Sequence, residues 1–148
     1  MIRRQQQKRQ QEQQIEGYKF KEVTTSNGLF CQFDDWNGVI LLDVKAPFTA
    51  EDFATIESII NPYIASHGEL KGVIINSKKF PYWSSPANRQ EYLNFAASNH
   101  QKFKKAAFAM GGIFAKIVAR MARGRVRPEI KIFKHGQIEK AQDWILLK

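Results

Sequence analysis

The sequence has a single cysteine, no long apolar stretch and no apolar segment directly after residues 1–4. Each of these shortages excludes a class of protein. The chain has a single cysteine, Cys31, so it can form no internal disulfide and no thiolate zinc site. Its longest mostly apolar stretch, residues 106–115, is about half the roughly 20 residues that a membrane-spanning helix needs. Residues 1–4 lead into glutamines instead of an apolar core, so we expect no signal peptide. We therefore expect a cytoplasmic protein.

Acidic residues are also scarce. The chain has 14 Asp and Glu against 23 Lys and Arg, which gives a formal net charge of +9. The excess is concentrated in residues 102–131, which carry nine basic residues and one acid, Glu129. Such a segment favours an anionic partner, whether nucleic acid, lipid headgroups or an acidic protein. The alternative is a solvated face that keeps the protein in solution.

Catalytic motifs are missing as well. The three histidines, His67, His100 and His135, have no neighbour at metal-ligand spacing. The sequence has no Gly-x-Ser-x-Gly elbow and no Walker-type phosphate loop. We expect a protein that is not an enzyme and that holds no cofactor or metal, although a site assembled from distant residues would leave no motif.

The composition does predict one folded domain behind a polar tail. At 148 residues and 43% hydrophobic, with 11 Phe, the chain suits a single domain with a proper core. Residues 1–17 are mostly Gln, Arg and Lys and have no apolar face, which predicts a disordered or flexible tail. The residue composition changes at Tyr18, where apolar residues become frequent, so residues 18–148 form the predicted domain.

Alternating apolar residues predict three short strands at 20–25, 29–33 and 39–44. Residues 26–28 and 34–38 between them are typical of tight turns, which makes the strands an antiparallel meander. Cys31 alternates with Phe30 and Phe33, which indicates a buried, small apolar side chain.

Helical patterns follow, each with a start signal. Thr49 and Asp52 can form a capping box ahead of a helix that His67-Gly68 would end. Ser85-Pro86 is typical of a cap with proline in the first turn, and predicts a helix to about Asn99.

The remaining elements complete the α/β pattern. We expect further strands at 72–76, 106–110 and 130–133, and further helices at 113–123 and 137–147. Strands that alternate with helices predict a mixed sheet with an antiparallel N-terminal edge and a parallel core, flanked by about four helices.

Several short segments also carry a resemblance to a known family. They are residues 49–53, the mid-helix Pro62, His67-Gly68, the strand at 73–75 and residues 141–145. Their order and spacing, over roughly residues 38–148, resemble the SpoIIAA-like family of the STAS/Sec14 group. The resemblance implies a STAS-like fold that serves protein regulation or small-ligand sensing instead of catalysis.

The first candidate site follows from this resemblance. STAS proteins that antagonise anti-sigma factors have an Asp-Ser pair where a central strand passes into the next helix, and a kinase phosphorylates that serine. The stretch here is Trp83-Ser84-Ser85-Pro86, with tryptophan in place of the acid and proline in place of the usual glycine. Ser84 and Ser85 are a candidate phosphorylation or partner site, or Ser85 is an ordinary helix cap. We expect a protein partner, whose identity the sequence leaves open.

The second candidate is a basic surface around a glycine turn. Lys116, Arg120 and Arg123 share one stripe of a predicted helix, and a glycine turn at its start can offer N–H groups to an anion. The alternative is a helix whose apolar stripe packs on the sheet while its cations face water. The candidate anion-binding residues are Gly111, Gly112, Lys116, Arg120, Arg123, Arg125 and Arg127.

The third candidate is an apolar pocket. Phe80, Tyr82 and Trp83 form an aromatic loop that, with Phe114, could roof a cavity, because Sec14-type relatives hold lipids between sheet and helices. Clustered aromatics also pack simply with one another. Two functions stay open: a regulatory or protein-binding module, and a carrier or sensor of a small apolar or anionic ligand. The oligomeric state stays open too.

Overall fold

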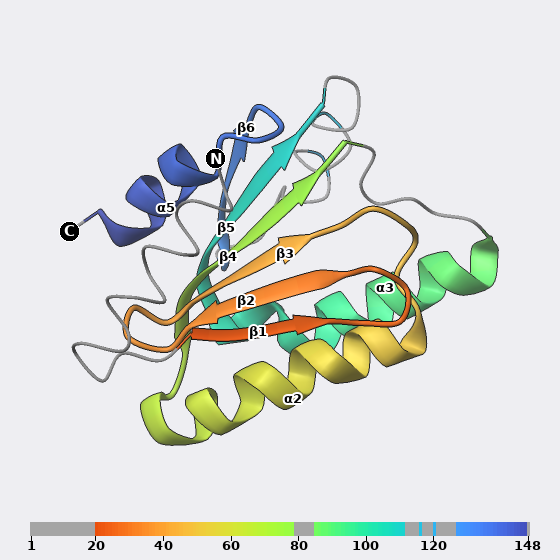
Figure 1. Ribbon diagram of the computed structural model, residues 1–148, viewed down its shortest axis with the longest axis horizontal. Helices are drawn as coiled ribbons and strands as arrows, with labels where there is room; N and C mark the ends of the chain where they lie inside the picture. Colours follow the sequence, from red (N-terminus) through yellow and green to blue (C-terminus); the bar gives the residue numbers. More distant parts are fainter. Residues whose placement is uncertain (1–19, 79–84, 112–115, 117–119, 121–126, 148) are drawn as a thin grey trace.

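The computed structural model describes residues 20–78, 85–111, 116, 120 and 127–147, so the predicted tail lies outside the described residues. Six strands form one sheet in which each strand lies beside its neighbour in the sequence (Figure 1). The strands are β1 (Phe20–Thr24), β2 (Phe30–Asp34), β3 (Val39–Asp43), β4 (Leu70–Ser77), β5 (Phe103–Met110) and β6 (Glu129–Phe133).

The sheet is mixed, as the sequence predicted. β1, β2 and β3 pair in antiparallel fashion, and β3 to β6 are parallel to one another. The β2–β3 turn is closed by Asp34, whose Oδ1 accepts from the backbone N–H groups of Trp36 (3.1 Å) and Asn37 (3.0 Å). This side-chain turn explains why a short polar run joins two apolar strands.

Three α-helices occur among the described residues: α2 (Ala50–His67), α3 (Pro86–Asn99) and α5 (Ile138–Leu146). A short 3₁₀ helix, η1 (His100–Lys102), follows α3. The predicted capping box is confirmed, because Thr49 Oγ1 accepts from Asp52 N while Asp52 accepts from Thr49 N. The fourth predicted helix, at 113–123, lies mostly outside the described residues. Within this range Lys116 and Arg120 are described, and both are helical.

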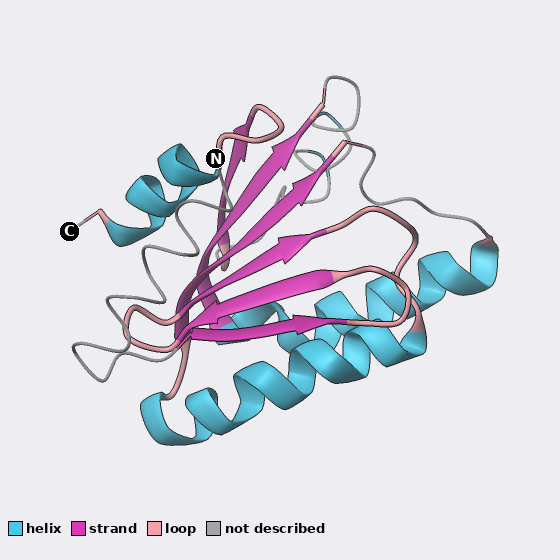
Figure 2. Ribbon diagram, viewed as in Figure 1, coloured by secondary structure: helices cyan, strands magenta, loops and turns pink. Residues whose placement is uncertain are grey.

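The helices lie on opposite faces of the sheet (Figure 2), with α2 and α3 on one face and α5 on the other. The sequence of β3 is continuously apolar because both of its faces are covered. Ile40 and Leu42 join the core under α2, whereas Val39 and Leu41 join the core under α5. A strand that is covered on both faces needs apolar residues at every position. Cys31 is fully buried in the first core, as predicted.

Gly72 lets α5 approach the sheet closely. A Cβ atom at Gly72 would lie 2.7–2.9 Å from three side-chain carbons of Ile145 on α5. These distances are shorter than any normal carbon contact, and Ile145 is only 4% exposed, so it has little room to move. The glycine therefore sets the distance between α5 and β4.

We predict that Gly72→Ala destabilises the protein by about 1–3 kcal/mol, because the added methyl group overpacks this contact. Ile145→Val alone should cost about 0.5–1.5 kcal/mol through lost burial. In the double variant the smaller side chain should relieve part of the clash, so the two costs should not add. Urea denaturation of all four proteins measures this, and strict additivity would contradict the contact.

Candidate functional site

Several buried polar side chains, among them Asp52 and Asn76, lie where the parallel strands end and two helices begin. β3 and β4 end at the edge of the sheet from which α2 and α3 start, on the right of Figure 1. Ligands and partners of open α/β sheets commonly bind at this carboxyl edge.

Phe48, just before α2, ties the starts of the two helices together. Its backbone N–H donates to Tyr92 Oη of α3 (2.9 Å), and its carbonyl accepts from Asn88 Nδ2 of α3 (2.9 Å). The rings of Phe48 and Tyr92 are also stacked, with centroids 5.3 Å apart, and Phe53 of α2 meets both rings edge-on. Phe48 thus fixes the start of α2 relative to the N-terminal part of α3.

A buried carboxylate fixes the start of α2 in turn. Asp52 is fully buried, and its Oδ2 accepts from Thr49 N (2.8 Å) and from Asn27 Nδ2 (2.9 Å). Asn27 Nδ2 also donates to the carbonyl of Pro47 (2.8 Å). The turn between β1 and β2 is therefore joined to the segment that carries Phe48.

Ser85 caps the start of α3, as predicted. Its Oγ accepts from Asn88 N (3.1 Å), Pro86 follows in the first turn, and the Ser85 side chain is exposed. Ser84 lies outside the described residues. Arg89 and Leu93 follow Ser85 at intervals of four residues, so the three share one side of α3, and all three are exposed.

A second polar network at this edge was not predicted. Asn76 near the end of β4 donates through Nδ2 to Asp43 Oδ1 (3.2 Å) on β3, and its Oδ1 accepts from Gly136 N (2.9 Å) before α5. Its own carbonyl accepts from Val44 N (2.9 Å). Asn76 is 4% exposed, so this network fixes the strand ends and does not offer a binding group to solvent. Its one sequence signal was an asparagine that ends an otherwise apolar strand.

The residues of the predicted anion-binding surface are only partly described. Lys116 and Arg120 are exposed, whereas Gly112, Arg123 and Arg125 lie outside the described residues. Gly111 follows β5 at the carboxyl edge, but Arg127 precedes β6 at the opposite edge, where it forms an ion pair with Glu69. The hydrogen bond from Arg127, helped by Lys104, holds the pKa of Glu69 below its ordinary value. Arg127 thus belongs to a local charge cluster away from Gly111.

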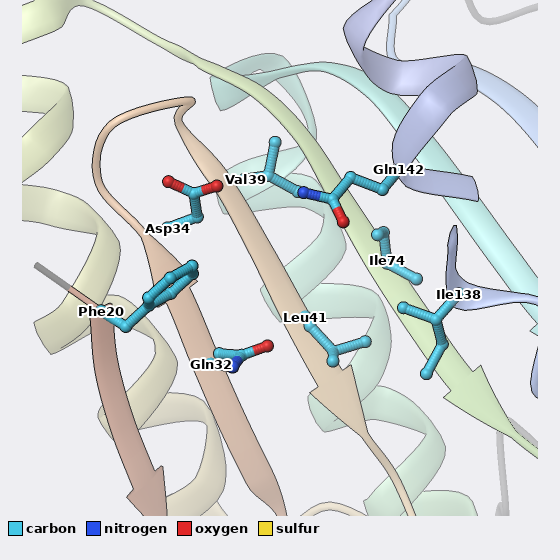
Figure 3. Close-up of a pocket in the computed structure, with 8 residues that line it drawn as sticks. All are labelled: Phe20, Gln32, Asp34, Val39, Leu41, Ile74, Ile138 and Gln142. Carbon is cyan, nitrogen blue, oxygen red and sulfur yellow. The ribbon is translucent and has the colours of Figure 1, made fainter. Parts of the chain in front are cut away.

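The residues of the predicted apolar pocket, Phe80, Tyr82, Trp83 and Phe114, all lie outside the described residues. A small hollow does occur elsewhere, between α5 and strands β1 to β4 (Figure 3). Its space is about 20 Å³, the room that one water molecule needs. The lining residues are Phe20, Gln32, Asp34, Val39, Leu41, Ile74, Ile138 and Gln142.

The chemistry available to the described residues is limited. No group of three or more His, Cys, Asp or Glu side chains among them could hold a metal ion. Burial, together with the negative charge of Asp52, raises the pKa of the Cys31 thiol to about 12. The thiol is therefore protonated at neutral pH and is a poor nucleophile.

A protein-family model described as SpoIIAA-like matches residues 39–146, which include β3 to β6 and all three described helices. No curated protein and no solved structure matches the chain. None of the helices within the described residues is long and apolar enough to cross a membrane.

We predict that Ser85→Ala lowers the free energy of unfolding by about 0.5–2 kcal/mol, because Asn88 N loses its cap acceptor. Ser85→Asp should retain most of the stability, since aspartate caps equally well and its charge suits a helix N-terminus. Ser98→Ala, at an exposed position near the end of the same helix, is the matched control and should change little. Urea denaturation measures all three, and equal effects of Ser85→Ala and Ser98→Ala would contradict the cap.

We also predict that Cys31 does not react with Ellman's reagent in the folded protein at pH 8. The thiol is fully buried and its pKa of about 12 leaves almost no thiolate at that pH. In denaturant the same thiol should react at the rate of an ordinary cysteine. Rapid stoichiometric reaction of the folded protein would show instead that the Cys31 thiol is accessible to solvent.

Proposed function

We propose that this chain, which belongs to the SpoIIAA-like family, is a non-catalytic regulatory module that binds a protein partner through the outer face of α3. The family match is the observation that carries the regulatory role. The position of the binding surface rests on the exposed stripe that begins at Ser85.

The exposure of α3 supports this choice of surface. Only Tyr92 and Asn99 of its 14 residues are buried, so most of the helix faces away from the sheet. Leu93 is 40% exposed, and it is one of four large hydrophobic side chains exposed among the described residues. A partner that covered Leu93 would gain apolar burial, while Arg89 one turn earlier would favour an acidic group beside it.

The site is also rigid before any partner binds. Asn88 and Tyr92 hold α3 to the backbone of Phe48, so the exposed stripe has a fixed position relative to the sheet. A preordered surface loses less conformational entropy on binding. Phosphorylation of Ser85 would add negative charge at the start of this stripe and would alter the affinity of a partner that contacts it.

The alternative function is a carrier or sensor of a small apolar or anionic ligand, and the residues of its candidate apolar pocket lie outside the described part of the chain. The hollow under α5 has room for about one water molecule and is lined by three polar side chains, Gln32, Asp34 and Gln142. It is too small for a lipid tail.

We predict that the tagged full chain captures a specific protein from cells of its source, and that Arg89→Glu combined with Leu93→Asp reduces this capture at least tenfold. The changes reverse a charge and add another on the proposed contact surface. Ser58→Asp adds one negative charge at an exposed position of α2, away from the proposed contact surface, and is the control for added charge. Quantitative mass spectrometry of the three captures compares them, after circular dichroism shows that each variant is folded.

Two results would contradict the proposal. One is a partner that the α3 variant retains as well as the Ser58→Asp control does. The other is native mass spectrometry that shows a small molecule bound in stoichiometric amount to the purified chain, which would favour the carrier function.

A further inference from the structure

β6 is the last strand of the sheet, and no other described strand lies beyond it. The strand order runs from β1 to β6, and β6 pairs with β5 (Figure 1). The outer edge of such a strand presents backbone N–H and C=O groups that can pair with one more strand. The proposed function, which uses α3, leaves this edge of the sheet without a role.

The side chains of β6 alternate between the two faces of the sheet. Ile130 and Ile132 pack against the core under α2, whereas Phe133 packs against the core under α5. Because side chains along a strand alternate, Glu129 and Lys131 share the face of Phe133. Both are exposed, and Lys131 Nζ lies 5.4 Å from the centroid of the Phe133 ring. β6 therefore carries an acid and a base two residues apart on one face of an edge strand.

This pattern is self-complementary in an antiparallel pairing of two β6 strands. A two-fold axis perpendicular to the sheet keeps every side chain on its own face and makes each contact occur twice. When the pairing is centred on Ile130, Glu129 of each copy lies directly opposite Lys131 of the other. When it is centred on Lys131 two lysines are opposed, and when it is centred on Ile132, Lys131 lies opposite Phe133. The register centred on Ile130 is therefore the one that electrostatics favours.

The opposite edge of the sheet offers no such match. In β1, Lys21 and Glu22 are consecutive residues and so lie on opposite faces of the sheet. No pairing about a perpendicular two-fold axis can place these two side chains opposite each other. Charged residues on an edge strand commonly keep other chains away. Those of β6 differ because their spacing of two residues turns repulsion between copies into attraction.

We propose that two copies of this chain form a dimer through β6, antiparallel and centred on Ile130, so that the two sheets join into one. The two Glu129–Lys131 pairs select this register, and Ile130 of each copy meets Ile130 of the other on the opposite face. So short an interface makes a weak dimer that forms at high protein concentration. The axis also places both copies of α3 on the same face of the joined sheet, where a bivalent partner could contact both.

Sedimentation equilibrium of the full chain tests the dimer. The samples cover about 10 µM to 1 mM protein, the range of a weak association, in about 0.15 M salt to screen the net charge of +9. We expect a monomer–dimer equilibrium. Glu129→Lys should raise the dissociation constant about tenfold, because two attractive pairs become repulsive. Lys131→Glu should have a similar effect, whereas Asp143→Lys, the same charge change at an exposed position of α5, should change it little.

Two rescue experiments separate this contact from a loss of folding. The double variant Glu129→Lys with Lys131→Glu restores both pairs in reverse order and should dimerise within about twofold of the original chain. An equimolar mixture of the two single variants should also dimerise, because every lysine at these positions then meets a glutamate of the other copy. Circular dichroism checks that each variant is folded.

Three results would overturn the proposal. The first is a monomer at every concentration, and the second is an equal effect of Glu129→Lys and Asp143→Lys. The third is a double variant that dimerises as weakly as the single variants, because the copies would then meet in another register or at another surface. None of these substitutions lies on α3, so this proposal and the proposed function can fail separately.

Discussion

The buried carboxylate of Asp52 is the constraint on which the carboxyl edge depends. Its Oδ2 brings together the N–H of Thr49 and the side chain of Asn27, which lie in different parts of the chain. Its Oδ1 accepts no hydrogen bond from any described residue, so the group carries part of its desolvation cost uncompensated. Asp52 holds the segment in front of α2, and Phe48 in that segment holds α3. The position of Ser85 therefore follows from a carboxylate on another helix.

This construction separates the surfaces of the molecule. α2 and α3 are fastened to one face of the sheet, while the Gly72–Ile145 contact seats α5 on the other. The outer side of α3 is held in place by the hydrogen bonds of Asn88 and Tyr92 to the backbone of Phe48.

Local signals predicted most of the fold. The capping box of Thr49 and Asp52 spans three residues, and the Ser85-Pro86 cap spans two, so both were visible in the sequence. Long-range contacts were not visible: Asn76 meets Asp43 33 residues away and Gly136 60 residues away. β5 begins at Phe103, three residues before the predicted start. The first residues of the strand were missed because Lys104 and Lys105 interrupt its apolar pattern. Lys105 is accommodated there because its Nζ donates to the carbonyl of Trp144 and lies over the Trp144 ring.

We propose that a protein partner covers the outer face of α3. Hydrogen–deuterium exchange of the full chain, alone and bound to its captured partner, tests it most directly. We expect added protection in peptides from residues 85–97 and none in peptides from α5, which lies on the opposite face of the sheet. Protection confined to α5, with residues 85–97 unchanged, would contradict the claim.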